Sequence, residues 1–224
     1  MNRAPKIMKT SHLFARLAAG TLVAGLLVCL GGLTGCLSRP ALKKQTFAFD
    51  VIPFSATNAL GSDRILGIRT LQIAPPFEGR SLVYRNGENA YERDPYAEFL
   101  DEPNNQLITA VRGWWQVYGG FSAVVEPDSA LKPNLVVEIC VNRLYGDFRQ
   151  PERPLAVLSM RFVFFDAPHG IPGKLLLQKE YARSIPLSQS NAAALVGGWN
   201  QALAEVLKQV SADLRPAELG RGNF

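Results

Sequence analysis

The chain of 224 residues is long enough to form a hydrophobic core, and 47% of its residues are hydrophobic. Its formal net charge of +5 comes largely from the first 35 residues, because residues 36–224 hold 20 basic and 19 acidic side chains. That balance argues against a nucleic-acid partner, since a nucleic-acid binder concentrates basic residues on one face.

The first 35 residues have the layout of a cleaved secretory signal peptide. Residues 17–38 carry no charge, and every charged residue ahead of them is basic: Arg3, Lys6, Lys9 and Arg16. A basic segment, an apolar run and small residues at the cut are typical of such a leader. An uncleaved transmembrane helix is the alternative, because about 18 apolar residues can span a membrane. Against it, five glycines weaken the run as a helix.

The tetrapeptide Leu33-Thr34-Gly35-Cys36 closes this run and resembles the bacterial lipobox. Leu33, Thr34 and Gly35 would be recognised by the signal peptidase, because small residues let the chain lie extended in a narrow groove. The Cys36 thiol is the most nucleophilic group present and would be alkylated to a thioether-linked diacylglycerol. We expect the mature protein to begin at Cys36 and to be held in a membrane by two or more acyl chains. No cofactor is expected besides this covalent lipid.

Residues 36–44 are expected to form a short lipidated tether. In Gram-negative bacteria, an aspartate after the acylated cysteine keeps a lipoprotein in the inner membrane, whereas this chain has Leu37 and Ser38. We therefore expect the periplasmic face of the outer membrane rather than the inner membrane. Because roughly eight residues reach at most ~30 Å, the folded part would lie close to the bilayer. Lys43 and Lys44 could contact anionic headgroups or simply be solvated.

Cysteine usage predicts a domain that is stabilised by packing rather than by disulfides. Cys29 would leave with the leader and Cys36 would be acylated, so that only Cys140 remains. We expect a single domain over residues 45–215 and a flexible tail over residues 216–224.

Alternation of apolar and polar residues predicts the first strands. Phe47, Phe49 and Val51 share one face of a strand over Thr46–Ile52, and a second strand is predicted over Ile68–Ala74.

A β-hairpin is predicted next, with strands over Ser81–Arg85 and Glu88–Glu92. Asn86-Gly87 between them favours a type I′ turn, because both residues accept a positive φ.

The first predicted helix begins at Asp101-Glu102-Pro103 and ends at Gly119-Gly120. Its apolar stripe consists of Leu107, Val111, Trp114 or Trp115, and Tyr118. Adjacent tryptophans on a helix cannot both face the same core, so we expect at least one indole in the core, and a partly exposed second indole is the alternative. Trp114, Trp115 and Tyr118 are therefore candidate contacts for a partner or ligand, beside the simpler interpretation that they pack in the core.

More strands and one long helix complete the chain. The strands are predicted over Phe121–Glu126, Asn134–Tyr145, Leu155–Asp166 and Lys174–Ser184. Ser188 or Ser190 would cap the helix, and Pro216 would lie beyond its end. Its apolar stripe comprises Leu195, Trp199, Leu203, Val206, Leu207, Val210 and Leu214. Strands and helices do not alternate strictly, so the predicted class is α+β with a largely antiparallel sheet and two main helices.

A series of short motifs begins with Ile73-Ala74-Pro75-Pro76 and Leu82-Val83-Tyr84-Arg85-Asn86-Gly87 and continues through a tyrosine-rich segment with Tyr91 and Tyr96. With these motifs, residues 45–214 resemble the ABC-type transport auxiliary lipoprotein family. A tryptophan-bearing helix, the paired strands Val136–Arg143 and Val157–Phe165, and the alanine-rich helix Ala192–Leu214 follow in the family's order.

The resemblance implies a role rather than a reaction. Such lipoproteins serve systems in which an inner-membrane ABC transporter, with its permease and ATPase, and a mammalian-cell-entry (MCE) protein move lipids or other apolar molecules across the periplasm. The implied partners are that MCE protein and that transporter, and assembly into a homo-oligomeric ring would suit a tunnel. A structural envelope scaffold and an autonomous lipid-binding carrier remain the alternatives.

Enzyme chemistry is not indicated by the sequence. A hydrolase triad or a histidine-based metal site would have only His169 to use, because His12 lies in the leader. Ser159 lies in an alternating strand without a G-x-S-x-G motif, so that packing explains it. Cys140, between Ile139 and Val141, is expected to be an inert and mostly buried thiol. We expect no catalytic residues and no metal or cofactor ligands.

One segment concentrates acidic residues, with Arg93 as its only base. It could dock a basic partner, but a solvated hairpin followed by a helix N-terminus explains it more simply. The acidic residues are Glu88, Glu92, Asp94, Glu98, Asp101 and Glu102.

Overall fold

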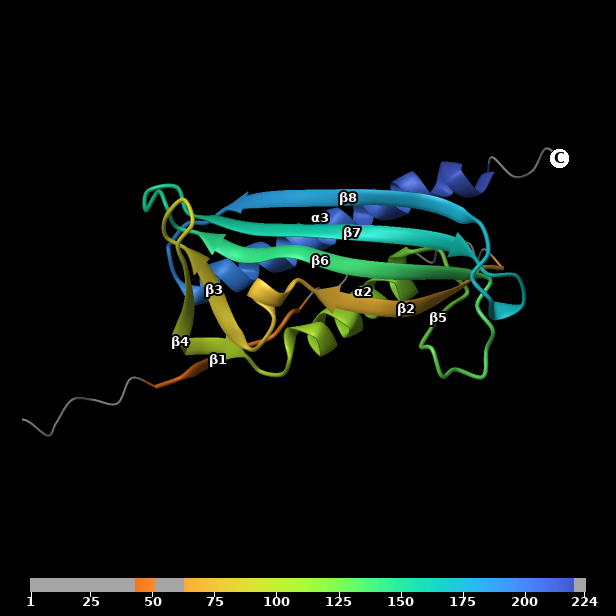
Figure 1. The fold of residues 1–224 in the computed structure, drawn as a ribbon, viewed down its shortest axis with the longest axis horizontal. Helices are drawn as coiled ribbons and strands as arrows, with labels where there is room; N and C mark the ends of the chain where they lie inside the picture. The colour runs from red at the N-terminus through yellow and green to blue at the C-terminus, as the bar shows by residue number, and fades with distance from the viewer. Residues whose placement is uncertain (1–42, 51–62, 220–224) are drawn as a thin grey trace, which may run out of the picture. The chain divides into compact units, whose positions relative to one another are not determined.

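The computed structural model describes residues 43–50 and 63–219 of the chain, and from Lys44 onward the chain forms one compact unit. The described residues form one eight-stranded sheet and two long helices (Figure 1). This confirms the predicted α+β class and the single domain. The predicted signal peptide and most of the tether lie outside the described residues.

The sheet is organised around β6 (Leu135–Asp147). Along one side, β6 pairs antiparallel with β7 (Leu155–Asp166), which pairs antiparallel with β8 (Leu175–Pro186). Along its other side, β6 pairs first with β2 (Ile65–Ile73) and then with β3 (Ser81–Arg85). Both of these pairings are parallel.

Parallel pairs are a feature that the sequence did not indicate. The two longest pairings, β6·β7 and β7·β8, are antiparallel, as predicted. Besides the β6 pairs, β1 (Gln45–Phe47) lies parallel to β4 (Tyr91–Phe99), and β5 (Ala123–Val125) lies parallel to β2. The alternation of side chains along a strand is the same in both directions, so it carries no information on strand direction.

The predicted hairpin is correct in its first strand and wrong in its turn. β3 covers Ser81–Arg85 as predicted, but β4 begins only at Tyr91, and the Asn86 N–H donates to the Ala90 carbonyl at 3.0 Å. The connection is therefore five residues long, and Gly87 is not among the glycines with positive φ. A type I′ turn needs positive φ at both central residues, which excludes it here.

Both helices pack on one face of the sheet (Figure 1). Helix α2 (Pro103–Tyr118) contacts β2 and β5, and helix α3 (Ala192–Leu219) contacts β7 and β8. Every residue of the predicted apolar stripe of α3 is buried. The cap differs from the prediction, because Asn191 Oδ1, rather than Ser188 or Ser190, accepts the Ala194 N–H at 2.8 Å.

Two element ends also differ from the predictions. Helix α3 continues through Pro216 to Leu219, where the sequence predicted an end before Pro216. Packing of the turn before it, with Leu214 buried, offsets the backbone hydrogen bond that a proline removes. At the other end of the chain, β1 stops at Phe47 instead of reaching Ile52, and residues 51–62 lie outside the described part.

Candidate functional site

Lys44 marks the start of the folded unit and is held by an ion pair. Its Nζ lies 2.6 Å from Glu98 Oε2, and Glu98 also accepts a hydrogen bond from Arg80 Nη2 at 2.9 Å. The chain thus enters the fold at β1 with its backbone beside β4. Lys43 is exposed.

The aromatic residues of α2 lie in the core instead of on the surface. Trp115 contacts Phe162 and Phe164 with ring centroids 5.9 Å apart, and Trp114 contacts Tyr118 at 5.3 Å. Both indoles are buried, which confirms that at least one lies in the core and excludes the alternative of a partly exposed second indole. The reason is that α2 contacts helix α3 as well as the sheet, and more than one of its sides is covered. Tyr118 is half-buried, and a partner contact through it stays a prediction.

The carboxylates of the acidic segment have local partners. Asp94 accepts the Tyr84 hydroxyl at 2.6 Å, and this bond, together with burial, raises the pKa of Tyr84. Asp101 accepts the Glu102 N–H at 2.8 Å, and Glu92 accepts Asn86 Nδ2 at 3.0 Å. These hydrogen bonds agree with the simpler interpretation, in which most of the acidic segment has a local structural role and does not dock a partner.

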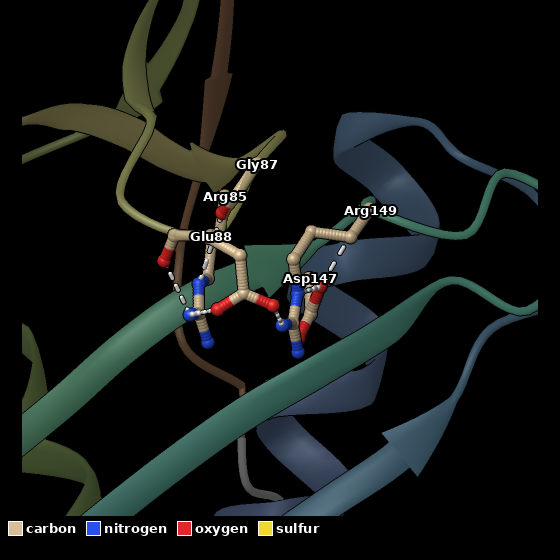
Figure 2. Close-up of polar contacts among 5 residues, drawn as sticks. All are labelled: Arg85, Gly87, Glu88, Asp147 and Arg149. Carbon is tan, nitrogen blue, oxygen red and sulfur yellow. Dashed lines mark hydrogen bonds and ion pairs between the residues drawn. The ribbon is translucent and has the colours of Figure 1, made fainter.

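Glu88, another acidic side chain of this segment, belongs to a cluster with two arginines (Figure 2). The cluster forms where the β3–β4 connection meets the end of β6, because the parallel β3·β6 pairing places Arg85 opposite Asp147. Arg149 follows Asp147 by two residues in the β6–β7 connection. Loops at the end of a sheet commonly carry binding residues.

Arg149 is fixed by Asp147. Its Nε and Nη2 donate to the two carboxylate oxygens of Asp147 at 2.9 and 2.8 Å, and its backbone N–H donates to Oδ1 at 3.3 Å. These bonds hold the pKa of Asp147 below its ordinary value and raise that of Arg149. Asp147 is buried, so the pair is oriented by a carboxylate that is itself anchored in β6.

Arg85 is fixed independently of Arg149. Its Nε donates to the Gly87 carbonyl at 3.3 Å and its Nη2 donates to the Glu88 carbonyl at 2.5 Å. The guanidinium also lies 5.8 Å from the centroid of the Tyr91 ring. Backbone acceptors and an aromatic face therefore set its position.

The Glu88 carboxylate lies between the two arginines (Figure 2) without a close contact to either guanidinium. Its Oε2 lies 3.8 Å from Arg85 Nη2, and its Oε1 lies 3.5 Å from Arg149 Nη1. Its side chain is 87% exposed. The sequence alone does not indicate the cluster of Arg85, Asp147 and Arg149, because only the β3·β6 pairing brings Arg85 to the other two.

Two residues with reactive groups have structural surroundings. Ser159 is buried and its hydroxyl donates to Glu180, which accepts that bond as a carboxylate and has a lowered pKa. Cys140 is half-buried, and its thiol donates to Asn142 Oδ1 at 3.2 Å. Both arrangements agree with the packing roles expected for these residues.

A groove of about 560 Å³ lies between one side of α2 and the segment Ala48–Asp50. Phe49, Leu100, Ala110 and Val117 provide its apolar lining. In the described ranges, no group of three or more histidine, cysteine or acidic side chains is placed to hold a metal ion. No helix within those ranges has both the length and the apolar character needed to cross a membrane.

Among the comparisons with known proteins, only the search of solved structures finds similar proteins, and it supports the fold. A scan of protein-family models and a search of curated proteins find no match to the sequence. Protein XCC0632 from Xanthomonas campestris, assigned to the family DUF330, is similar with a TM-score of 0.66 and 15% identity, covering 79% of this chain and 98% of its own. An uncharacterised protein is similar with a TM-score of 0.60 and 12% identity, covering 76% and 98%. At these identities the similarity concerns the fold alone.

A weaker match concerns lipoprotein GNA1162 from Neisseria meningitidis. Its TM-score is 0.35 at 14% identity, with 66% of this chain and 97% of that chain covered. This score is too low to support a relationship.

Proposed function

We propose that this protein is a lipid-anchored lipoprotein of the cell envelope that acts as a non-enzymatic auxiliary component of an MCE/ABC-type intermembrane transport system. The observation that carries the proposal is the position of the lipobox relative to the fold. Cys36 precedes Lys44, at which the folded unit begins, by eight residues. An acylated Cys36 would thus hold the domain within ~30 Å of the bilayer.

The order of motifs along the chain supports the transport part of the proposal. That order resembles the ABC-type transport auxiliary lipoproteins, and the α+β fold agrees with such a domain. Lipids or other apolar solutes are the proposed cargo. The outer membrane, facing the periplasm, is the proposed location.

Tethering supplies a physical reason for such an arrangement. A domain confined near one membrane meets the end of a bridging MCE protein at a raised effective concentration, so its docking surface needs little intrinsic affinity. The face of the sheet opposite α2 and α3 exposes polar side chains, among them Arg143, Arg161 and Gln178, to such a partner.

A crosslinked pull-down of the full-length protein from its own envelope tests the proposal. Mass spectrometry should recover an MCE protein or an ABC permease or ATPase. Cys36→Ala is the matched control, because it removes the lipid anchor while leaving the folded unit unchanged. Recovery of neither transport component with the wild-type protein would reject the transport role and leave an anchored scaffold.

Cys36→Ala also tests the anchor itself. We expect the variant to keep its fold and to remain unacylated, with the leader uncut, as shown by intact mass. A cleaved, membrane-retained Cys36→Ala protein would contradict the lipobox interpretation.

The apolar groove along α2 favours one alternative, a carrier that binds lipid by itself. Lipid extraction from the purified protein separates the two functions. A carrier should retain lipid in the absence of any partner, whereas a docking component should not.

A further inference from the structure

We propose that Arg85 and Arg149 form a binding site for a phosphate group, with Glu88 as an internal competitor for the same position. The phosphate could belong to a free phosphate ion or to a phospholipid headgroup. The site goes beyond the proposed transport role, and only the lipid source would depend on that role.

The two guanidinium groups are held in place before any ligand arrives. Arg149 is fixed by the buried Asp147, and Arg85 is fixed by the Gly87 and Glu88 carbonyls and by the Tyr91 ring. Neither arginine depends on the Glu88 carboxylate for its position. Preorganised donors bind more tightly, because little side-chain freedom is lost on binding.

Glu88 is a weak occupant of the space between the arginines. Its two contacts, at 3.5 and 3.8 Å, exceed the usual range of a hydrogen bond, and its side chain is 87% exposed. An exposed ion pair of this kind is weak, because solvent screens its charges. A ligand can therefore displace the carboxylate at small cost.

The chemistry between the arginines suits phosphate better than a carboxylate. Glu88 needs a different oxygen for each arginine and reaches neither closely. A phosphate offers three strong acceptor oxygens and a charge of about −1.5 to −2, so that it can bond both guanidinium groups at once. With Glu88 displaced, two arginines face one aspartate, and the site carries a positive charge. Glu92 lies nearby but is hydrogen-bonded to Asn86.

An exposed aromatic ring lies beside the charged groups and offers an apolar surface to a ligand. The Tyr91 ring is 49% exposed and packs edge-on against the buried Tyr145, with centroids 5.5 Å apart. A phosphate that carries an apolar substituent would gain contact area on this ring, whereas inorganic phosphate would not.

Isothermal titration calorimetry on the full-length protein in an uncharged detergent tests the site. Inorganic phosphate is one probe, and a water-soluble short-chain phosphatidylglycerol is the other. Arg149→Gln and Arg85→Gln should each weaken binding about tenfold, because each removes a charged donor. Arg153→Gln is the matched control, since this exposed arginine lies in the same β6–β7 connection.

Glu88→Gln is the decisive variant, since it changes only an exposed side chain and should fold normally. Removal of the competing charge should tighten phosphate binding about two- to fivefold. Weaker or unchanged binding in this variant would overturn the proposal, as would equal losses in Arg153→Gln and Arg149→Gln. The absence of saturable binding of either probe to wild type and Glu88→Gln would overturn it as well.

Comparison of the two probes identifies the source of the phosphate. Tighter binding of the short-chain lipid, reduced by Tyr91→Ala, supports a headgroup site. Equal affinities support a site for the phosphate ion. Equally tight binding of a glutamate-rich peptide would overturn the preference for phosphate. A failed pull-down with intact phosphate binding would reject the transport role alone.

Discussion

The two faces of strand β7 differ in what their side chains contribute. On the face toward the helices, Leu158, Met160, Phe162 and Phe164 are completely buried. On the opposite face, Arg161 is exposed. Ser159 is buried there and donates a hydrogen bond to Glu180. The covered face therefore holds the fold together by burial, whereas the open face is stabilised by polar pairs that contribute little each. Substitutions can therefore accumulate on the open face without unfolding the domain.

The largest expected effect comes from a change on the covered face. Phe162→Ala should lower the free energy of unfolding by about 3–5 kcal/mol, because it leaves a cavity under Trp115 and Tyr181. Arg161→Ala, one residue away on the open face, should change it by less than about 0.5 kcal/mol. Urea denaturation measures both. Similar losses in the two variants would contradict the difference between the faces.

A smaller effect is expected where Gly67 of β2 lies against the Pro133 ring. A Cβ on Gly67 would lie 2.9 Å from Pro133 Cγ, so Gly67→Ala should cost about 1–3 kcal/mol. Gly113→Ala is the matched control, since nothing lies within 4 Å of its Cβ position on helix α2. It should stabilise the protein by about 0.5–1 kcal/mol. Thermal unfolding of both variants would show opposite signs, and a stabilised Gly67→Ala would exclude the predicted clash.

The next effect concerns the N-terminal cap of helix α3. Asn191→Ala should cost about 1 kcal/mol, because the Ala194 N–H loses its acceptor. Ser188→Ala should be nearly neutral, since the structure assigns the cap to Asn191. Chemical denaturation distinguishes the two variants. A larger loss of stability in Ser188→Ala would show that Ser188 caps the helix instead of Asn191.

The smallest effect concerns the polar contacts between α3 and β8, and it depends on pH. Asp213 accepts bonds from Lys179 and Tyr181 at 2.7 and 3.0 Å, and the Lys179 ammonium holds its pKa below the ordinary value. The stabilisation is thus present above the ordinary aspartate pKa of about 4 and is lost as the pH falls below it. Asp213→Asn should lower stability at neutral pH and flatten its decline on acidification. A wild-type decline that Asp213→Asn leaves unchanged would show that other groups cause it.

The sequence predicted those elements whose side chains follow one strong pattern. The bounds of β7 match the predicted run at both ends, and the stripe of α3 is buried in full. The turn after β3 was mispredicted, because Asn86-Gly87 favours a tight turn locally, whereas Arg85 bonds the Gly87 and Glu88 carbonyls in a longer loop.

The arginine cluster could not be predicted at all. Arg85 and Asp147 meet only through a parallel strand pairing, and strand partners that lie far apart in sequence leave no local signal. Whether the second tryptophan is buried was left open by the sequence for a related reason. It depends on α2 contacting helix α3 as well as the sheet, which the helix sequence alone does not reveal.

The position of β6 has a consequence for the order of folding. β6, β7, β8 and α3 follow one another directly in the chain, whereas β2 and β3 must wait for β6 before they can pair with it. Contacts between neighbours in sequence form faster than those that close long loops. β3 can already pair with its neighbour β4, whereas both partners of β2 lie far away in sequence. We therefore expect amides of β6–β8 to gain protection before those of β2 in pulse-labelled hydrogen exchange. A chain that emerges N-terminus first would thus keep β2 unpaired until β5 and β6 have followed it.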